Sequence, residues 1–405
     1  MSKVVRQSEI LLPHNVDFGK WAVIACDQFT SQLDYWKKLE LFVGNNPSTL
    51  NITYPEIYLN DNMEKRVNKI NKTMQEYLDN DLFDKYNSFI LVERIVDGGK
   101  KRLSLVVSVD LEAYDWNRVN TQIRASEDTI LERLPVRLKI RKNAPIELPH
   151  IILLIDDEKK DIVEKLYKNR KNLQKLYDFE LNMGGGHLKG WKVDNCEEII
   201  DKFEGLLNKE LQIAKYGQDA KIMFAVGDGN HSMATAKQHW NNLKEKLTEE
   251  EKINHPARFC LVEVLNIYDD GLNFEPIHRV VSKYDDKFLE DFAKIMKGES
   301  KITIITTEKD IKLPCPSSSS QTIKLVQEFI EDRLKKGLVE VDYIHDEHHT
   351  RKVVADTNGI GIIMPEFSRE ELFDYVVNVG NLPKKAFSIG TAENKKYYME
   401  AKKIK

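Results

Sequence analysis

Polar residues that could carry out chemistry are concentrated at Gly227 to Ser232, with the sequence GDGNHS. The apolar run Ile222 to Val226 precedes them and predicts a strand covered on both faces. From Met233 to Leu247, apolar residues recur at steps of three and four, as on one face of a helix. Glycine lets the backbone adopt a positive φ, and the start of a helix exposes unpaired N–H groups. The sequence therefore predicts an anion-binding turn at the start of a helix.

The side chains of this turn suggest specific roles in catalysis and binding. Asp228 could hold a magnesium ion or accept the proton of a substrate hydroxyl, and His231 could act as an acid, a base or a hydrogen-bond donor to phosphate. Four further residues of the turn would bind the phosphate or substrate: Gly227, Gly229, Asn230 and Ser232. The alternative is a purely structural turn with His231 buried beneath Trp240, but adjacent polar side chains are costly to bury without partners.

Further candidates for the same pocket are spread along the chain. Arg124, Arg279 and Lys385 would supply positive charge, because guanidinium and ammonium groups suit phosphate. His278 places a titratable group beside Arg279 and is a third catalytic candidate. The other candidates are Glu127, His187 and Asp27. Asp27 follows the strand-like stretch Trp21 to Cys26, where open α/β sheets bind ligands, but it could also cap the predicted helix Leu33 to Val43.

Three other motifs each admit two interpretations. Asp156-Asp157 follows the predicted strand Ile151 to Ile155 and could hold magnesium or favour the start of a helix over Ile162 to Leu176. The sequence MGGGH at Met183 to His187 is either a hairpin tip or a backbone cradle for phosphate, and it lacks the lysine of a P-loop. HDEHH at His345 to His349 is more typical of a surface loop than of a metal site.

Length and composition limit the class of protein. At 405 residues the chain exceeds one ordinary hydrophobic core, so we expect two or three packed subdomains. A net charge of −4 and a pI near 6.3 give no electrostatic reason to expect a nucleic-acid partner. Four scattered cysteines and a polar start predict a reduced, cytoplasmic protein. No apolar run approaches the roughly 20 residues of a membrane helix, so no membrane partner is expected.

The pattern of elements predicts an α/β fold with a mixed sheet. The apolar runs Phe89 to Val96 and Leu103 to Asp110 are joined by a turn containing Asp97-Gly98, which is a strong hairpin signal. Antiparallel pairing there gives the N-terminal part α+β character. We divide the chain into residues 1–150, an α+β part, residues 151–298, a core with the GDGNHS turn, and residues 299–405, a small α/β subdomain.

With these stretches in hand, the chain resembles a bacterial and archaeal family, domain of unknown function ten-fifteen, along nearly its whole length. The matching stretches are CDQFTS at Cys26 to Ser31, IRASEDTILERLPVRLKIRKNAPIELPH at Ile123 to His150, MGGGH at Met183 to His187, GDGNHSMATAK at Gly227 to Lys237, HPAR at His255 to Arg258, FEPIHR at Phe274 to Arg279 and LPKKAFSIG at Leu382 to Gly390. Many relatives carry Asp-Gly-His-His-Arg where this chain has Asp-Gly-Asn-His-Ser at Asp228 to Ser232. Because the arginine is missing, we expect positive charge to come from other segments.

The Asp-Gly-x-His signature is similar to one in the ParB/sulfiredoxin-like fold, which includes CTP-binding partition proteins and free-serine kinases. This resemblance implies that the turn binds nucleotide phosphates, with ATP, ADP or CTP and magnesium as the expected cofactors. The leading hypothesis is an enzyme acting on a small phosphorylated metabolite or nucleotide, most concretely a phosphotransferase toward a hydroxyl metabolite such as serine. The alternative is a noncatalytic metabolite-binding regulator. A DNA-associated role is disfavoured by the negative net charge.

Overall fold

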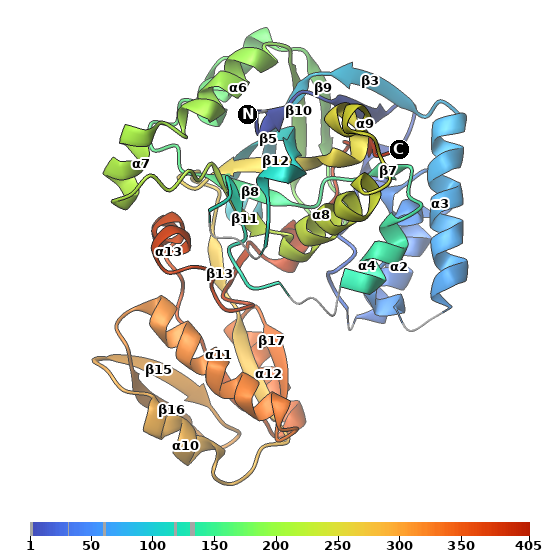
Figure 1. The fold of residues 1–405 in the computed structure, drawn as a ribbon. Coiled ribbons are helices and arrows are strands. Elements are labelled where there is room, and N and C mark those ends of the chain that lie inside the picture. The colour runs from blue at the N-terminus through green and yellow to red at the C-terminus, as the bar shows by residue number, and fades with distance from the viewer. Residues whose placement is uncertain (1–2, 31, 60–61, 117–119, 130–133) are drawn as a thin grey trace. The chain divides into compact units, whose positions relative to one another are not determined.

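The chain forms two compact units in a computed structural model that describes residues 3–30, 32–59, 62–116, 120–129 and 134–405 (Figure 1). Unit 1 contains Met1–Ala125, Thr129–Leu272 and Ala392–Lys405, and unit 2 contains Ser126–Asp128 and Asn273–Thr391. Residues before and after position 150, which the sequence analysis assigns to different parts, contribute strands to one sheet of unit 1. The last residue of the CDQFTS stretch, Ser31, lies outside the described residues.

Unit 1 is built on a mixed sheet. Within the described residues, nine strands join it in the spatial order β6-β11-β8-β12-β5-β4-β10-β9, with β1 paired to β5. Their bounds are β1 (Val5–Arg6), β4 (Phe89–Ile95), β5 (Lys101–Asp110), β6 (Ile123–Arg124), β8 (Ile152–Ile155), β9 (Lys175–Glu180), β10 (His187–Val193), β11 (Phe224–Asp228) and β12 (Phe259–Asn266). β11 pairs in parallel with β6, and β12 with β8, whereas the other pairs are antiparallel. The expected α/β class with a mixed sheet is confirmed.

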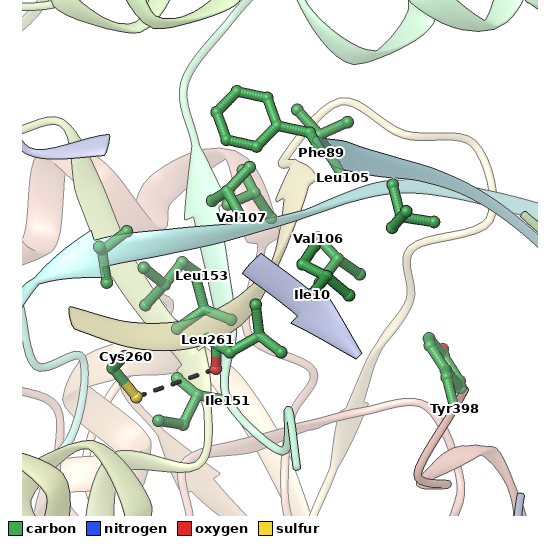
Figure 2. Close-up of a cluster of buried hydrophobic side chains, with 14 of the residues drawn as sticks. Ile10, Phe89, Leu105, Val106, Val107, Ile151, Leu153, Cys260, Leu261 and Tyr398 are labelled. Carbon is green, nitrogen blue, oxygen red and sulfur yellow. Dashed lines mark hydrogen bonds between the residues drawn. The ribbon is translucent and has the colours of Figure 1, made fainter. Parts of the chain in front are cut away.

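The central strands of this sheet form the core of unit 1. Figure 2 shows apolar side chains of β4, β5, β8 and β12 gathered in one cluster, among them Phe89, Leu105 and Leu153. These three side chains are fully buried, as the nearly continuous apolar sequence of the strands predicts. Burial of this apolar surface is the main favourable contribution to folding. The sheet is therefore a rigid base for side chains placed along its edges and at strand ends.

Helices and two short strand pairs complete unit 1. The helices are α1 (Phe18–Trp21), α2 (Leu33–Val43), α3 (Met63–Asp79), α4 (Leu134–Arg141), α5 (Val163–Lys168), α6 (Cys196–Gly205), α7 (Lys209–Tyr216), α8 (Asn230–Lys244) and α9 (Glu249–Asn254). β2 (Glu9–Pro13) pairs with β3 (Phe83–Asn87), and β7 (Ile146–Glu147) pairs with β20 (Lys402–Lys403). None of the helices in the described parts of the chain is long and apolar enough to cross a membrane.

Two predicted elements of unit 1 are wrong. The helix predicted over 162–176 ends at Lys168, because Lys175–Glu180 forms β9 and pairs with β10. The strand predicted over 21–26 is irregular, although residues 21–25 are buried, and its single bridge joins Ile24 to Lys396. In both places tertiary contacts override the local pattern.

Unit 2 is a smaller α/β unit. Its sheet has five strands in the order β16-β15-β18-β14-β17 in the described chain, and β13 pairs separately with β19. The elements are β13 (Phe274–Pro276), β14 (His278–Ser282), α10 (Phe288–Ile295), β15 (Ser300–Ile305), β16 (Asp310–Cys315), α11 (Ser319–Lys335), β17 (Glu340–Ile344), α12 (Glu347–Thr357), β18 (Ile360–Ile363), α13 (Leu372–Asn378) and β19 (Phe387–Ile389). The rings of Phe274 and Phe387 stack 4.1 Å apart and help to hold the β13–β19 pair together.

Candidate functional site

The GDGNHS turn joins β11 to α8, as its strand-to-helix pattern predicts. Gly229 occupies the N-cap position of α8 with φ at 83°. A Cβ atom there would lie 3.0 Å from the carbonyl oxygen of His150 and 3.1 Å from the Cα atom of Ile151. Glycine is therefore favoured both by the positive φ and by the close approach of this second segment. The turn is held against the residues that precede β8.

Beside this turn, unit 1 has a pocket on one face of the sheet. The strand register places Val106, Glu263, Ile152 and Asp228 in one row across β5, β12, β8 and β11. Residues directly opposite one another on paired strands share a face, and all four line the pocket. The remaining lining residues are Ala25, Arg102, Pro149, His150, Ile151, Asn394, Lys395, Lys396 and Tyr398.

Two ion pairs at this pocket bring together carboxylates and cations from distant segments. The Oδ2 atom of Asp27 lies 3.3 Å from Nε2 of His150, and Oδ2 of Asp228 lies 2.8 Å from Nζ of Lys395. The two pairs influence each other, because His150 and Lys395 each act on the pKa of both carboxyl groups. We call Asp27, His150, Asp228 and Lys395 the charged cluster. The cluster combines two carboxylates with two basic side chains.

The pKa shifts fix the charge of each member of the cluster. Burial raises the pKa of both carboxyl groups, but the neighbouring cations outweigh it and lower the pKa of Asp228 and, further, that of Asp27. Burial lowers the pKa of His150, but the carboxylate of Asp27 outweighs it, and the net shift is upward. Both aspartates are therefore ionised at neutral pH, and His150 is biased toward the imidazolium form.

A third cation, Arg137 of α4, lies at the Asp27 side of the cluster. Its guanidinium donates to the carboxylate of Glu56. Burial lowers the pKa of Arg137, but Glu56 and then the nearby Cys26 and Asp27 raise it, and the net shift is upward. The Cys26 thiol accepts a hydrogen bond from the Tyr397 hydroxyl at 3.1 Å, and burial raises its pKa to about 12. Cys26 is therefore a protonated thiol rather than a nucleophile.

Lys396, which lines the pocket, packs against the glycine-rich stretch. The Nζ atom of Lys396 donates to the backbone oxygen of Asn182 at 2.8 Å and to its Oδ1 atom at 2.9 Å. MGGGH forms the tip between β9 and β10, as one interpretation of its sequence predicts, and the Leu181 N–H donates to the Gly186 carbonyl at 2.7 Å. A Cβ atom on Gly185 would lie 2.2 Å from Cε of Lys396. Glycine at this position makes room for the lysine stem.

The other residues of the turn lie in the first turn of α8. Asn230 is buried, whereas His231 and Ser232 are partly exposed. The carbonyl oxygen of His231 accepts a hydrogen bond of 2.7 Å from the Thr235 hydroxyl. Gly227 is buried at the end of β11. Of the residues predicted to meet at this turn, the structure brings Asp27 and Asp228 into one cluster.

Arg124 and His187 also belong to unit 1, but their side chains have other partners. Arg124 of β6 is opposite Ala225 of β11, and its guanidinium donates to the backbone carbonyls of Thr121, at 3.2 Å, and Ala220. His187 lies at the start of β10, with Nδ1 2.6 Å from Glu180 and Nε2 2.6 Å from Asp178. Arg124 therefore supports the edge of the sheet, and His187 lies in the β9–β10 hairpin.

Four predicted site residues, Glu127, His278, Arg279 and Lys385, belong to unit 2. Arg279 is fully buried and donates to the Lys385 carbonyl at 2.9 Å and to Oε1 of Gln327 at 3.0 Å. The carboxylate of Glu127 accepts from the backbone N–H of Lys385 at 3.1 Å. His278 accepts the backbone N–H of Met364 at 3.2 Å. Within unit 2, these contacts hold the chain around Lys385, where φ is 62°.

Magnesium does not fit Asp228 in this arrangement. Its Oδ1 atom accepts the Gly229 N–H at 2.8 Å, and its Oδ2 atom is paired with Lys395. Magnesium needs near-octahedral oxygen ligands, so it would have to displace the lysine. Asp156 is similarly engaged, because it accepts from Lys215, Tyr216 and Tyr268. No group of three or more metal-ligating side chains is found among the residues that the structure describes.

Sequence reasoning missed the two basic members of the charged cluster, His150 and Lys395, as well as the nearby Arg137 and the pocket-lining Arg102. His150 ends a stretch that the family resemblance includes and directly precedes a predicted strand, which was a usable signal. Lys395 lies in a polar segment without a recognisable motif. Its role depends on the return of the chain to unit 1 after residue 391, which no local pattern reveals.

The family described as "Protein of unknown function (DUF1015)" matches residues 10–402. The chain belongs to this family. A comparison with curated proteins finds no match.

Several solved structures are similar at low identity. Free serine kinase in complex with AMP is 12% identical, with a TM-score of 0.42, and the match covers 75% of this chain and 94% of that protein. A conserved hypothetical protein from Pyrococcus furiosus is 11% identical, with a TM-score of 0.38 and coverages of 74% and 95%. SbnI from Staphylococcus aureus, truncated at its C-terminus, is 11% identical, with a TM-score of 0.37 and coverages of 70% and 82%.

Proposed function

We propose that unit 1 is an enzyme that binds a small phosphorylated or nucleotide substrate at the charged cluster and transfers its phosphoryl group to a hydroxyl metabolite such as serine. The observation that carries this proposal is the meeting of Asp27, His150, Asp228 and Lys395 at a pocket beside the start of α8. Phosphoryl transfer needs positioning and charge neutralisation more than covalent chemistry, and this cluster offers both.

In the proposed reaction, the ammonium of Lys395 and the imidazolium of His150 neutralise the phosphoryl oxygens. The N–H groups at the start of α8 add a fixed positive field, and His231 in the first helical turn is assigned to hydrogen bonding with phosphate. The acceptor hydroxyl forms the new O–P bond while the bond to the leaving group breaks. Phosphate first displaces the Asp228 carboxylate from Lys395, and Asp228 then accepts the proton of the acceptor hydroxyl. The nucleotides expected as donors are ATP, ADP or CTP.

A noncatalytic phosphate-binding regulator is the second candidate function. The observation that favours it is that both carboxylates of the cluster already have partners, at 3.3 Å and 2.8 Å. A base in such a pair must lose its cation before it can accept a proton. A regulator would bind phosphate in the same pocket without turnover, so binding and transfer must be measured separately.

The test combines calorimetry with phosphorus NMR. Inorganic phosphate, AMP, ADP and ATP are titrated into the protein, and phosphoryl transfer to serine is followed with and without magnesium. Lys395→Met should weaken phosphate binding by about 10- to 100-fold, because a charge-assisted hydrogen bond contributes roughly 1.5–3 kcal/mol. Asp228→Asn should abolish transfer while retaining binding, which separates the enzyme from the regulator.

Lys192→Met is the matched control. Lys192 forms an ion pair of the same length, 2.8 Å, with Asp194 in unit 1. This variant should bind phosphate like the unmodified protein. If none of the four ligands binds, or if Lys395→Met and Lys192→Met bind equally well, the proposal is wrong. Binding that depends on Lys395 without any transfer would favour the regulator.

A further inference from the structure

Two buried arginines lie directly opposite each other on neighbouring strands of unit 1. Arg94 of β4 is paired in register with Arg102 of β5, and their exposed fractions are 1% and 3%. Like charges directly opposite each other on paired strands are destabilising, and burial adds a desolvation penalty. Such a pair is costly to maintain unless anionic groups compensate it.

Burial lowers the pKa of both arginines, but Tyr398, Glu263 and Asp269 outweigh it at Arg102 and raise its pKa overall, whereas the pKa of Arg94 stays lowered. Among the described residues, Glu263 is the one carboxylate within 4.0 Å of either group, at 3.6 Å from Nη2 of Arg102. The Tyr398 hydroxyl lies 2.7 Å from the same Nη2 atom and 3.3 Å from Nη1 of Arg94. The Nε atoms of both arginines are buried and have no hydrogen-bond partner in the part of the chain that the structure describes. Buried polar groups of this kind are normally hydrogen-bonded.

The two arginines differ in what they face. Arg94 donates to backbone oxygens of Gly185, at 3.1 Å, and of Asn394, so it holds neighbouring segments in place. Arg102 lines the pocket together with Glu263 and Tyr398. A purely structural explanation therefore accounts for Arg94 better than for Arg102, whose side chain contributes to the pocket wall.

We infer that the part of the pocket lined by Arg102 is an anion subsite, where Arg102, paired in register with Arg94, receives an acidic group of the substrate. This inference rests on the proposed function and deepens it. The substrate carries a phosphoryl group at the charged cluster and a second acidic group, a carboxylate or another phosphoryl group, at Arg102. Asp228 and Glu263 lie in the same row of the sheet, with Ile152 between them, and both line the pocket with Arg102.

The test compares small ligands that differ in the second acidic group. Ethyl phosphate differs from phosphoglycolate in having a methyl group where phosphoglycolate has a carboxylate. Pyrophosphate supplies a second phosphoryl group instead. By calorimetry on the full chain, phosphoglycolate or pyrophosphate should bind at least tenfold more tightly than ethyl phosphate. The ligand with the advantage identifies the source of the second acidic group. If neither ligand has this advantage, the subsite is refuted, and this result requires no variant.

Variants of Arg102 then show whether the preference arises at the subsite or from overall charge. Arg102→Lys keeps the charge but loses the planar fork, and Arg102→Gln loses both. We expect Arg102→Lys to reduce the preference and Arg102→Gln to abolish it, while ethyl phosphate binding changes less than about threefold. Circular dichroism and thermal unfolding confirm that each variant is folded. A preference that survives in folded Arg102→Gln would refute the assignment.

A glycolate titration separates failure of the subsite from failure of the proposed function. If glycolate binds in an Arg102-dependent manner and ethyl phosphate does not bind at all, the subsite stands and the proposed function fails. If ethyl phosphate binds in a Lys395-dependent manner and no second acidic group improves binding, the proposed function stands and the subsite fails.

Discussion

The stability of unit 1 should depend on pH through Lys396. This side chain is 8% exposed, and its Nζ atom is held by the two oxygen atoms of Asn182. Burial, and then the nearby charge of Arg94, lowers the pKa of Lys396 from 10.5 to about 7. In the unfolded chain the same amine regains its ordinary pKa. Folding therefore favours loss of a proton from this lysine.

The sign and size of the effect follow from proton linkage. Between about pH 7 and pH 10.5 the unfolded chain binds more protons at Lys396 than the folded protein, so the free energy of unfolding rises with pH. Each unit of pKa difference corresponds to about 1.4 kcal/mol, which gives about 5 kcal/mol over the whole range. Between pH 6 and pH 9 the expected gain is about 3 kcal/mol.

The assay is urea unfolding of the wild-type protein and of Lys396→Met at several pH values from 6 to 9. The variant loses the hydrogen bonds to Asn182 at every pH. Ionisation of Lys396 is therefore reported only by how the difference in the free energy of unfolding between the wild type and the variant changes with pH. The free energy of unfolding of the wild type, minus that of the variant, should rise by about 3 kcal/mol over this range. Lys69→Met, at an exposed position of α3, should show no such trend. A flat or falling difference for Lys396→Met would refute the reasoning.

Two further substitutions test the scaffold. Gly186→Ala should destabilise the protein by more than about 2 kcal/mol in urea unfolding. The reason is that φ is 82° at this position and that the new Cβ atom would lie 2.0 Å from the carbonyl oxygen of the last β4 residue. A loss below about 0.5 kcal/mol would contradict the hairpin geometry. Glu147→Gln should cost roughly 3–5 kcal/mol because it leaves the buried Lys402 and the partly buried Arg141 without their shared carboxylate, whereas Glu198→Gln in an exposed ion pair should cost less than about 1 kcal/mol. Equal losses in these two glutamine variants would show that burial does not control the effect.

Strongly periodic elements could be predicted from the sequence because their patterns are local. Helix 33–43 and the β4–β5 hairpin follow from apolar spacing and from Asp97-Gly98. The region after residue 168 could not be predicted in this way, because pairing of β9 with β10 decides between strand and helix there. Local sequence preference is a weak guide to secondary structure where pairing with a distant strand overrides it.

For the candidate site, the turn could be predicted from the sequence, but the basic residues around it could not. The GDGNHS turn combines a strand, two glycines and a helix start in one short stretch, so its position was evident. The two cations paired with Asp27 and Asp228, His150 and Lys395, come from residues far away in the sequence. Their approach depends on the packing of whole segments, and a single sequence contains no record of that packing.

The return of the chain to unit 1 has a consequence for biosynthesis. Ala392–Lys405 is translated only after all of unit 2, yet it supplies Lys395, Lys396 and Tyr398 to the pocket. A nascent chain from which this segment has not yet emerged lacks part of the pocket wall. The pocket can therefore mature only late in synthesis, and incomplete chains made in the cell are unable to form the candidate site.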